Sequence, residues 1–190
     1  MSLDPAGWIR DDPAGWTRDD SMARVRDDPM IRRRGLGIGG LPPRVAPHMT
    51  PAFDPRTLLA ESRIGVLATI KSNGRPQLSP ITPYYDRESD VVYVSMTDGR
   101  AKTANLRRDP RAALEVTRAD GWAWATAEGK VTLTGPGTDP NGPEVEALVD
   151  YYRSAAGEHP DWAEYRSVMV SDRRVLMALA VDRVYGERLR

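Results

Sequence analysis

Hydrophobic and polar residues alternate with a period of two along most of the chain from residue 50 onward. Such alternation is typical of strands that bury one face, and clusters of Gly, Asn, Asp and Pro between the runs mark turns. The pattern predicts six strands, at 64–70, 75–85, 91–96, 111–117, 122–133 and 175–184. Because tight turns join most of them and helices occur only as insertions, we expect an antiparallel barrel rather than a parallel sheet.

Four short helices are predicted between and around these strands. Asp54 followed by Pro55 is a typical helix start, an N-cap residue before a proline in the first turn, and this helix should run to Glu61. Further helices are expected at 101–108, 144–154 and 161–170. The fold class is therefore mainly β, of the α+β kind, with short flanking helices.

The predicted strand 75–85 contains three prolines, Pro76, Pro80 and Pro83. Proline has no backbone N–H to donate, so a strand rich in proline is restricted to the edge of a sheet or to a bulge. The Asn73-Gly74 pair before it tolerates the positive φ angles of a hairpin turn. We therefore expect an edge strand that is joined to its neighbour by a tight turn.

The first 49 residues have a different composition. Asp4–Asp11 recurs almost unchanged as Asp12–Asp19, and prolines, glycines and charged residues dominate the remainder. No stretch has a periodicity that could bury a face. We expect 1–49 to be a disordered leader and 50–190 to be one barrel domain, with Met49 as a natural translation start directly before it.

Composition excludes several classes of function. Lys+Arg and Asp+Glu both number 27, so no net charge favours a nucleic acid as partner. The chain has no cysteine, which excludes disulfides and thiolate chemistry, and His48 and His159 are too far apart to indicate a metal site. No apolar run approaches the length of a membrane span. We expect a soluble, cytoplasmic protein with no metal and no membrane partner.

Basic and amide side chains gather where the helix at 101–108 begins. Arg100 stands at the helix start, where the first-turn N–H groups have no helical partner and the macrodipole favours an anion. Lys102 and Asn105 are three residues apart and share a helix face. Together these groups suit a phosphate or a carboxylate. A solvated basic helix paired with Asp109 accounts for the spacing equally well, so both interpretations stay open.

Two further features suit a planar ligand. The odd positions of strand 122–133 are apolar and its even positions are polar, apart from Trp122 and Trp124 at its start. Large aromatic rings on an outward face indicate cover by a partner subunit or by a planar ligand. Gln77 and Ser79 alternate onto one face and offer an amide and a hydroxyl to ring heteroatoms, which alone is a weak signal.

Four stretches of the chain together resemble the pyridoxamine 5'-phosphate oxidase-like split-barrel proteins. They are Ile64–Ile70, Gly74–Ser79, Arg100–Arg111 and Val184–Gly186. Within this family the chain is most similar to the actinobacterial branch that uses the deazaflavin coenzyme F420, and Gly157–Trp162 resembles that branch as well. The resemblance runs in order from Asp54 to Gly186 and does not extend to 1–49.

The resemblance implies a six-stranded antiparallel split β-barrel that forms a homodimer, with two cofactor sites at the interface that both chains share. In this family, cations at the helix start hold the phosphate and acidic tail, the Gly-Arg-Pro-Gln-Leu-Ser strand flanks the deazaflavin, and the partner chain contributes residues from the Gly-Trp turn. Carried over to this chain, the cofactor-binding residues are Gln77, Ser79, Ser95, Arg100, Lys102, Asn105, Gly121, Trp122 and Trp124.

The implied function is an F420-dependent oxidoreductase, a reductase that transfers a hydride from reduced deazaflavin to a conjugated small molecule. The cofactor carries the chemistry, so we assign no catalytic residue. An FMN-dependent enzyme of the pyridoxamine-phosphate-oxidase type is the alternative, since both cofactors combine a planar ring with a phosphate. A non-enzymatic flavin- or tetrapyrrole-binding protein, with His159 as an axial ligand, is a further alternative.

Overall fold

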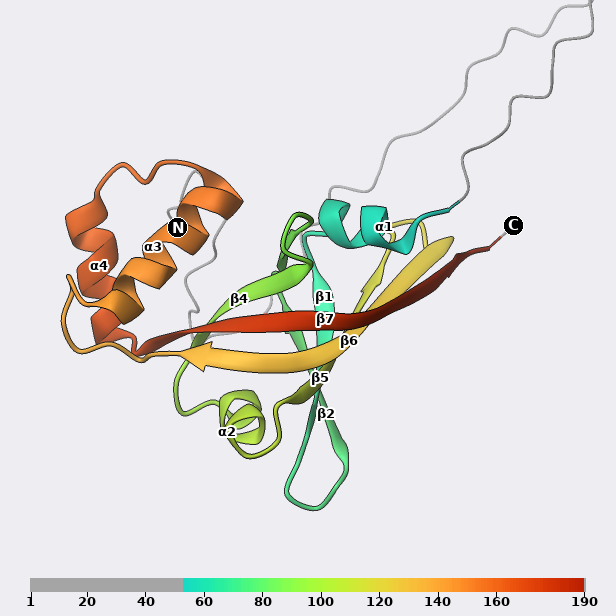
Figure 1. Cartoon of the computed structure of the whole chain (residues 1–190), viewed down its shortest axis with the longest axis horizontal. Coiled ribbons are helices and arrows are strands. Elements are labelled where there is room, and N and C mark those ends of the chain that lie inside the picture. Colours follow the sequence, from blue (N-terminus) through green and yellow to red (C-terminus); the bar gives the residue numbers. More distant parts are fainter. Residues whose placement is uncertain (1–52, 190) are drawn as a thin grey trace, which may run out of the picture. The chain divides into compact units, whose positions relative to one another are not determined.

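Seven antiparallel strands and four short helices make up residues 53–189, which are the residues that the computed structural model describes (Figure 1). The strands are β1 (Gly65–Ile70), β2 (Pro76–Ile81), β3 (Tyr84–Asp86), β4 (Val91–Thr97), β5 (Arg111–Thr117), β6 (Ala123–Thr134) and β7 (Arg174–Arg188). The helices are α1 (Pro55–Glu61), α2 (Ala101–Arg108), α3 (Pro143–Ala156) and α4 (Trp162–Ser171). The predicted leader, 1–49, lies outside the described residues.

The order of the strands explains why the sheet curls into a barrel. Neighbouring strands pair in the order β2-β1-β5-β6-β7-β4-β3, so β2 and β3 occupy the two opposite edges. Only Thr82 and Pro83 separate these two strands along the chain. The sheet must therefore bend until its edges meet, and because β2 and β3 do not pair with each other, the barrel stays split along that line. The prediction of a mainly β antiparallel split barrel is confirmed.

The number of strands differs from the prediction. We expected one strand at 75–85, whereas the structure has two, β2 and β3, paired to different neighbours. Pro83 is buried between them, has no N–H for a ladder and restricts the residue before it, so one continuous pairing cannot cross this point. The expectation that this segment lies at an edge is confirmed for both strands.

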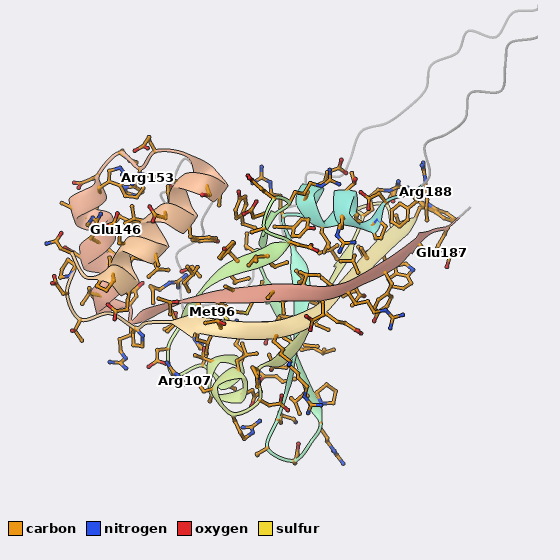
Figure 2. The ribbon with its side chains drawn as sticks, in the orientation of Figure 1. Met96, Arg107, Glu146, Arg153, Glu187 and Arg188 are labelled. Atoms are coloured by element: carbon orange, nitrogen blue, oxygen red, sulfur yellow. The ribbon has the colours of Figure 1, made fainter. Side chains whose placement is uncertain are left out.

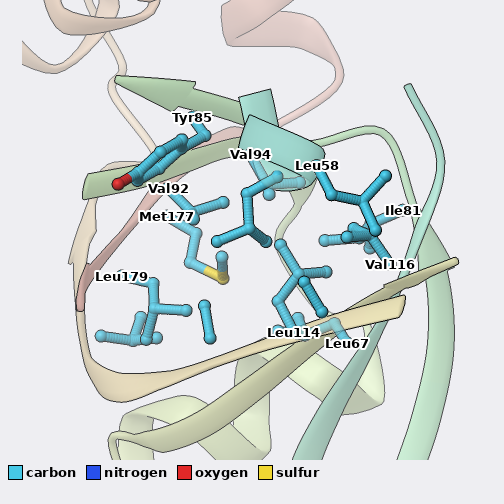
Figure 3. Close-up of a cluster of buried hydrophobic side chains, with 14 of the residues drawn as sticks. Leu58, Leu67, Ile81, Tyr85, Val92, Val94, Leu114, Val116, Met177 and Leu179 are labelled. Atoms are coloured by element: carbon cyan, nitrogen blue, oxygen red, sulfur yellow. The ribbon is translucent and has the colours of Figure 1, made fainter. Parts of the chain in front are cut away.

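One hydrophobic core fills the barrel, and it follows from the alternation of the strands. Inward positions of β1, β4, β5 and β7 are almost fully buried, as in the pattern of β4, where Val92, Val94 and Met96 are inward. Figure 3 shows Val92 and Val94 meeting Leu67, Leu114, Met177 and Leu179 in the interior, and Met96 belongs to the same core. Burial of this apolar surface is the main stabilising contribution, on the order of 25 cal/mol per Å².

Helix α1 adds two leucines to this core. Its start is as predicted: the side chain of Asp54 accepts a hydrogen bond from the Arg56 N–H at 3.0 Å, and Pro55 stands in the first turn. Leu58 and Leu59 are 6% and 2% exposed and belong to the core cluster. Figure 1 shows α1 over β6 and β7, whereas α3 and α4 form a hairpin at the opposite end of β7.

The longest pairing, between β6 and β7, approaches more closely than side chains would normally allow. A β-carbon added at Gly186 would lie 2.2 Å from the Trp124 carbonyl oxygen, and one added at Gly129 would lie 1.9 Å from the Ala180 carbonyl oxygen. The register of the pair shifts between Glu128 and Gly129, where the strand bulges. Glycine is required at both places because the opposing backbone occupies the position of a side chain.

Candidate cofactor-binding site

Asn105 of α2 lies at the centre of a buried polar group at one end of the barrel. Helix α2 packs against β1 and buries Thr103, Asn105 and Leu106. The Asn105 Nδ2 donates to Thr69 Oγ1 at 3.1 Å and to Gln77 Oε1 at 2.7 Å. Thr69 and Gln77 face each other in the register of β1 and β2, so one helical side chain ties both strands together.

Arg108 extends this group toward the surface. Its Nη2 donates to Asn105 Oδ1 at 3.3 Å and also to the backbone carbonyl of Ile70 at the end of β1. Asn105 is only 6% exposed, and every donor and acceptor of its side chain now has a partner. Since a buried amide without partners is costly, this arrangement stabilises the docking of α2 on the barrel.

Strand β2 presents Gln77 and Ser79 on its inward side. Both are half-buried, whereas Leu78 between them points outward and is 65% exposed. The Gln77 Nε2 lies 3.5 Å from Ser79 Oγ. Because β2 is an edge strand beside the split of the barrel, these two polar side chains can be reached by a ligand that lies along that edge.

The start of α2 carries cations in a position that disfavours them. Arg100 is the N-cap residue without a capping side-chain bond, Lys102 lies in the first turn, and the first turn has no acidic residue. The positive end of the helix dipole and the first-turn N–H groups, which have no partner within the helix, favour an anion there. A helix start that carries two cations is suited to bind an anionic group.

Asp98, just before α2, does not supply that anion because it is engaged with two other arginines. Its Oδ1 accepts from Arg107 Nη1 at 2.5 Å and its Oδ2 accepts from Arg173 Nη2 at 2.8 Å. These hydrogen bonds lower the pKa of Asp98 to about 2, the bond from Arg173 having the larger effect. Arg107 projects from α2 in Figure 2, so Asp98 links α2 to the segment that precedes β7.

This linkage predicts a pH dependence of stability. A carboxyl whose pKa is depressed on folding stabilises the folded state above its ordinary pKa, 3.8, and this contribution is lost as the pH falls toward 2. Asp98→Asn should therefore flatten the dependence of unfolding free energy on pH between about 4 and 2. Urea unfolding at several pH values measures it, with the exposed Asp182→Asn as control. An unchanged slope would contradict the linkage.

Ser95 lies apart from this group. It sits between the buried Val94 and Met96, so it points outward from β4. Its Oγ accepts from Arg174 Nε at 3.1 Å, and its backbone carbonyl accepts from Arg174 Nη2 at 3.1 Å. Tyr151 of α3 also bonds to the Ser95 backbone. The structure thus brings Ser95 toward α3, and its role in binding a cofactor stays a prediction.

Gly121, Trp122 and Trp124 lie at the start of β6, far from Gln77 within one chain. Gly121 has φ +76° in the turn, and Trp122, expected as the first residue of the strand, precedes it and is 53% exposed. Trp124 points outward and contacts Tyr185 edge-on, with ring centroids 5.9 Å apart.

The distance between the tryptophans and Gln77 follows from the register of the sheet. Gln77 pairs with Thr69, Thr69 with Ala112, and Ala112 with Gly129, so the polar group lies level with Gly129. Five residues of strand, about 17 Å, separate Gly129 from Trp124. Figure 2 marks the tryptophan end of the sheet by Glu187 and Arg188, which lie on β7 away from α3 and α4. The two groups of predicted residues do not meet in one protomer.

Thr69 and Arg108 belong to the site but were not predicted. Thr69 is a polar residue at an inward position of β1, on the same face as the buried Leu67, and it is 1% exposed. A polar residue at a core position of a strand is a signal for a buried hydrogen-bond partner. Arg108 carries no comparable signal, because one arginine at a helix end is common.

One cleft and one aromatic cluster of the described residues lie away from the Asn105 group. A cleft of about 280 Å³ between α3 and the outer side of β4 includes Tyr93, Asp150, Tyr151 and Leu176 and shares no residue with the predicted site. His159 packs among Tyr152, Trp162 and Tyr165, and its Nδ1 accepts from the Asp161 N–H at 3.0 Å. The hydrogen bond and the ring contacts hold the His159 imidazole within the α3–α4 hairpin.

Residues 53–189 contain neither a metal-binding cluster nor a membrane-spanning helix. Within that part of the chain, no three His, Cys, Asp or Glu side chains are arranged to hold a metal ion. None of its helices has the length and apolar character needed to cross a membrane.

The chain is similar to known proteins both in sequence and in fold. Residues 54–187 match the family model described as pyridoxamine 5'-phosphate oxidase. Among solved structures, an F420 reductase is 20% identical with a TM-score of 0.51, over 68% of this chain and 94% of that one. A conserved hypothetical protein from Mycobacterium tuberculosis is 22% identical with a TM-score of 0.54, over 70% of this chain and 81% of that one. These structural matches show the shared fold.

Proposed function

Because this chain belongs to the pyridoxamine 5'-phosphate oxidase family of split-barrel, flavin-binding oxidoreductases, we propose that it is an F420-dependent reductase of a conjugated small molecule. One observation carries the proposal: helix α2, whose start carries Arg100 and Lys102, is hydrogen-bonded through Asn105 to Gln77 of β2. The similarity of the fold to an F420 reductase is in keeping with this choice of cofactor.

The residues at the site fit such a cofactor. F420 combines a planar ring with a phosphodiester and a tail of glutamate carboxylates, so it is anionic over most of its length. Arg100 and Lys102 supply cations, and the α2 start supplies backbone N–H groups, and both favour an anion at this place. Gln77 and Ser79 are half-buried beside the split and offer hydrogen bonds to the edge of a ring.

The cofactor and the protein have different roles in the proposed reaction. Reduced F420 supplies the hydride when it is bound, and the protein binds and orients it. The α2 cations hold the anionic part, while β2 fixes the rotation of the ring and the outward side chains of a neighbouring subunit exclude water.

Titration with F420 tests the proposal. Quenching of F420 fluorescence on addition of the protein, followed by turnover of reduced F420 with conjugated substrates, supports it. A protein that is isolated yellow and binds FMN but not F420 supports the flavin alternative in the same site. Binding of F420 without reduction of any acceptor by reduced F420 supports a carrier rather than an enzyme.

We further propose that the functional unit is a homodimer, with the outward face of the sheet at its interface. Leu78 and Ile64 are 65% and 71% exposed there, and Trp122 adds another exposed apolar side chain at the start of β6. Because the tryptophan end and the Asn105 group are separated within one chain, a second copy would supply the tryptophans to each site.

The two tryptophans give a test of this dimer. Replacing Trp122 and Trp124 together by serine should weaken self-association and cofactor affinity by at least tenfold each, because interface tryptophans are among the largest contributors to binding. Sedimentation and F420 titration measure the two effects. The variant Trp162→Phe, in the α3–α4 hairpin, is the control. An intact dimer with full affinity would contradict the interface.

A further inference from the structure

Within the proposed function, we infer that Asn105 is a positioning residue, which holds the amide of Gln77 so that its Nε2, rather than its Oε1, is offered to the cofactor ring as a hydrogen-bond donor. Direct contact of Asn105 with the cofactor, which its place in the sequence motif implies, is then not its role. The inference rests on which atoms donate and which accept in the chain of bonds from Arg108 to Ser79.

The side chain of Asn105 has no donor left for a ligand. An asparagine amide has two N–H groups and one carbonyl oxygen. Nδ2 donates to Thr69 and to Gln77, at 3.1 Å and 2.7 Å, which uses both N–H groups. Only 6% of the residue is exposed, so it is covered by the elements that it joins.

Arg108 determines which way the Asn105 amide faces. A guanidinium only donates, so the atom of Asn105 that meets Arg108 must be Oδ1. Arg108 is itself held by the carbonyl of Ile70, which keeps the guanidinium on this side of the helix. Nδ2 is therefore directed toward β1 and β2. If the Asn105 amide were flipped, its NH₂ group would face the NH₂ group of Arg108, and two donors would meet.

The orientation of the Asn105 amide determines the orientation of the Gln77 amide. Because Asn105 donates, the atom of Gln77 that faces α2 must be the acceptor Oε1, and Nε2 then points along β2 to Ser79. Ser79 Oγ accepts from Nε2 over a long 3.5 Å, which leaves the Ser79 O–H to donate elsewhere. The inward side of β2 thus presents an N–H of Gln77 as a donor, beside the hydroxyl of Ser79, which can donate or accept.

The direction of the Gln77 amide discriminates between ligand groups. The pyrimidine part of flavins and deazaflavins has two carbonyl oxygens, either of which can accept a bond from Gln77 Nε2, whereas a ligand N–H at that position would meet a second donor. An unmatched buried polar group is costly, so the arrangement favours a ligand that turns a carbonyl oxygen toward Gln77. Asn105 acts on this choice without touching the ligand.

The variant Asn105→Asp tests the direction of these bonds with almost no change in shape. The carboxylate pairs with Arg108 and can only accept, so Gln77 must turn its Nε2 toward α2 and its Oε1 toward the ligand. We expect the dissociation constants for F420 and for FMN to rise about tenfold. Gln77→Ala should weaken binding in the parent protein but have little further effect in the Asn105→Asp protein.

Gln77 is the only glutamine of the chain, so its amide can be observed alone. Selective ¹⁵N-glutamine labelling of the side chain gives one NH₂ signal, which should move when F420 or FMN is added to the parent protein. In Asn105→Asp the signal should already be displaced without cofactor, because its hydrogen-bond partners have changed. Asn141→Asp, an exposed position before α3, introduces the same charge and is the control.

The outcomes separate this inference from the proposed function. Binding of neither F420 nor FMN by the parent protein would overturn the proposed function and this inference with it. Tight binding by the parent and by Asn105→Asp alike, with an unmoved Gln77 signal, would overturn this inference alone. Additive losses from Gln77→Ala and Asn105→Asp would also overturn it, since they would mean that the two residues act independently.

Discussion

Replacing Arg100 and Lys102 together by alanine is expected to raise the F420 dissociation constant by two to three orders of magnitude. Charge-assisted hydrogen bonds to an anion contribute about 1.5–3 kcal/mol each, and about 1.4 kcal/mol corresponds to a factor of ten. Both residues stand at the start of α2, where the helix dipole also favours the anion. Fluorescence titration at fixed ionic strength measures the change.

Salt dependence and a charge-matched control sharpen this prediction. Affinity of the parent protein should fall as salt is added, whereas that of the double variant should change little because fewer ions are exchanged. The exposed pair Arg63 and Lys71, replaced by alanine, removes the same charge and should leave affinity nearly unchanged. The melting temperature of the Arg100/Lys102 variant should stay close to that of the parent. Equal affinity of variant and parent would place the anion elsewhere.

Gly186→Ala is expected to destabilise the barrel by about 3 kcal/mol, the upper part of the range for inserting atoms into a closely packed site. The added methyl group would lie 2.2 Å from the Trp124 carbonyl oxygen and 2.9 Å from the Ala125 Cα, and both are backbone atoms of β6 that cannot turn away. The strands must separate locally, so the ladder between β6 and β7 weakens where Trp124 pairs with Glu187.

Thermal unfolding measures this effect, and the melting temperature should fall by about 10 °C for a chain of this size. Glu187→Ala adds no steric conflict at the neighbouring exposed position and is the control. A Gly186→Ala protein that melts with the parent would show that β6 and β7 are farther apart than the structure has them. The same reasoning explains why a glycine closes the Val184-Tyr185-Gly186 stretch.

Local chemistry was sufficient to predict several elements. Helix α2 and strand β5 have the predicted bounds, 101–108 and 111–117, because a proline, a glycine turn and a short apolar alternation lie at their ends. The Asn73-Gly74 turn forms as expected, with Gly74 at φ +77°. Strand β7 extends to Arg188, four residues beyond the prediction, because pairing with β6 continues past the outward polar Asp182 and Arg183.

The structure brings some of the predicted cofactor-binding residues together and separates others. Gln77, Ser79 and Asn105 are brought together as one hydrogen-bonded group, whereas Ser95 is directed toward α3 and the tryptophans lie at the other end of β6. Sequence motifs identify the residue types that a family conserves for a purpose, but they do not indicate whether a side chain touches the ligand or positions another residue. Thr69 and Arg108 were missed for this reason.

By itself, the sequence determines where strands, turns and helices begin, since alternation, caps, prolines and glycines act over a few neighbouring residues. It also determines the family, through motifs in a consistent order. Only the tertiary structure decides that the strands pair as β2-β1-β5-β6-β7-β4-β3 and that Asn105 meets Thr69 and Gln77, 36 and 28 residues away. The direction of a buried hydrogen bond depends on register and on the docking of α2 against the barrel, and no local pattern of residues encodes either.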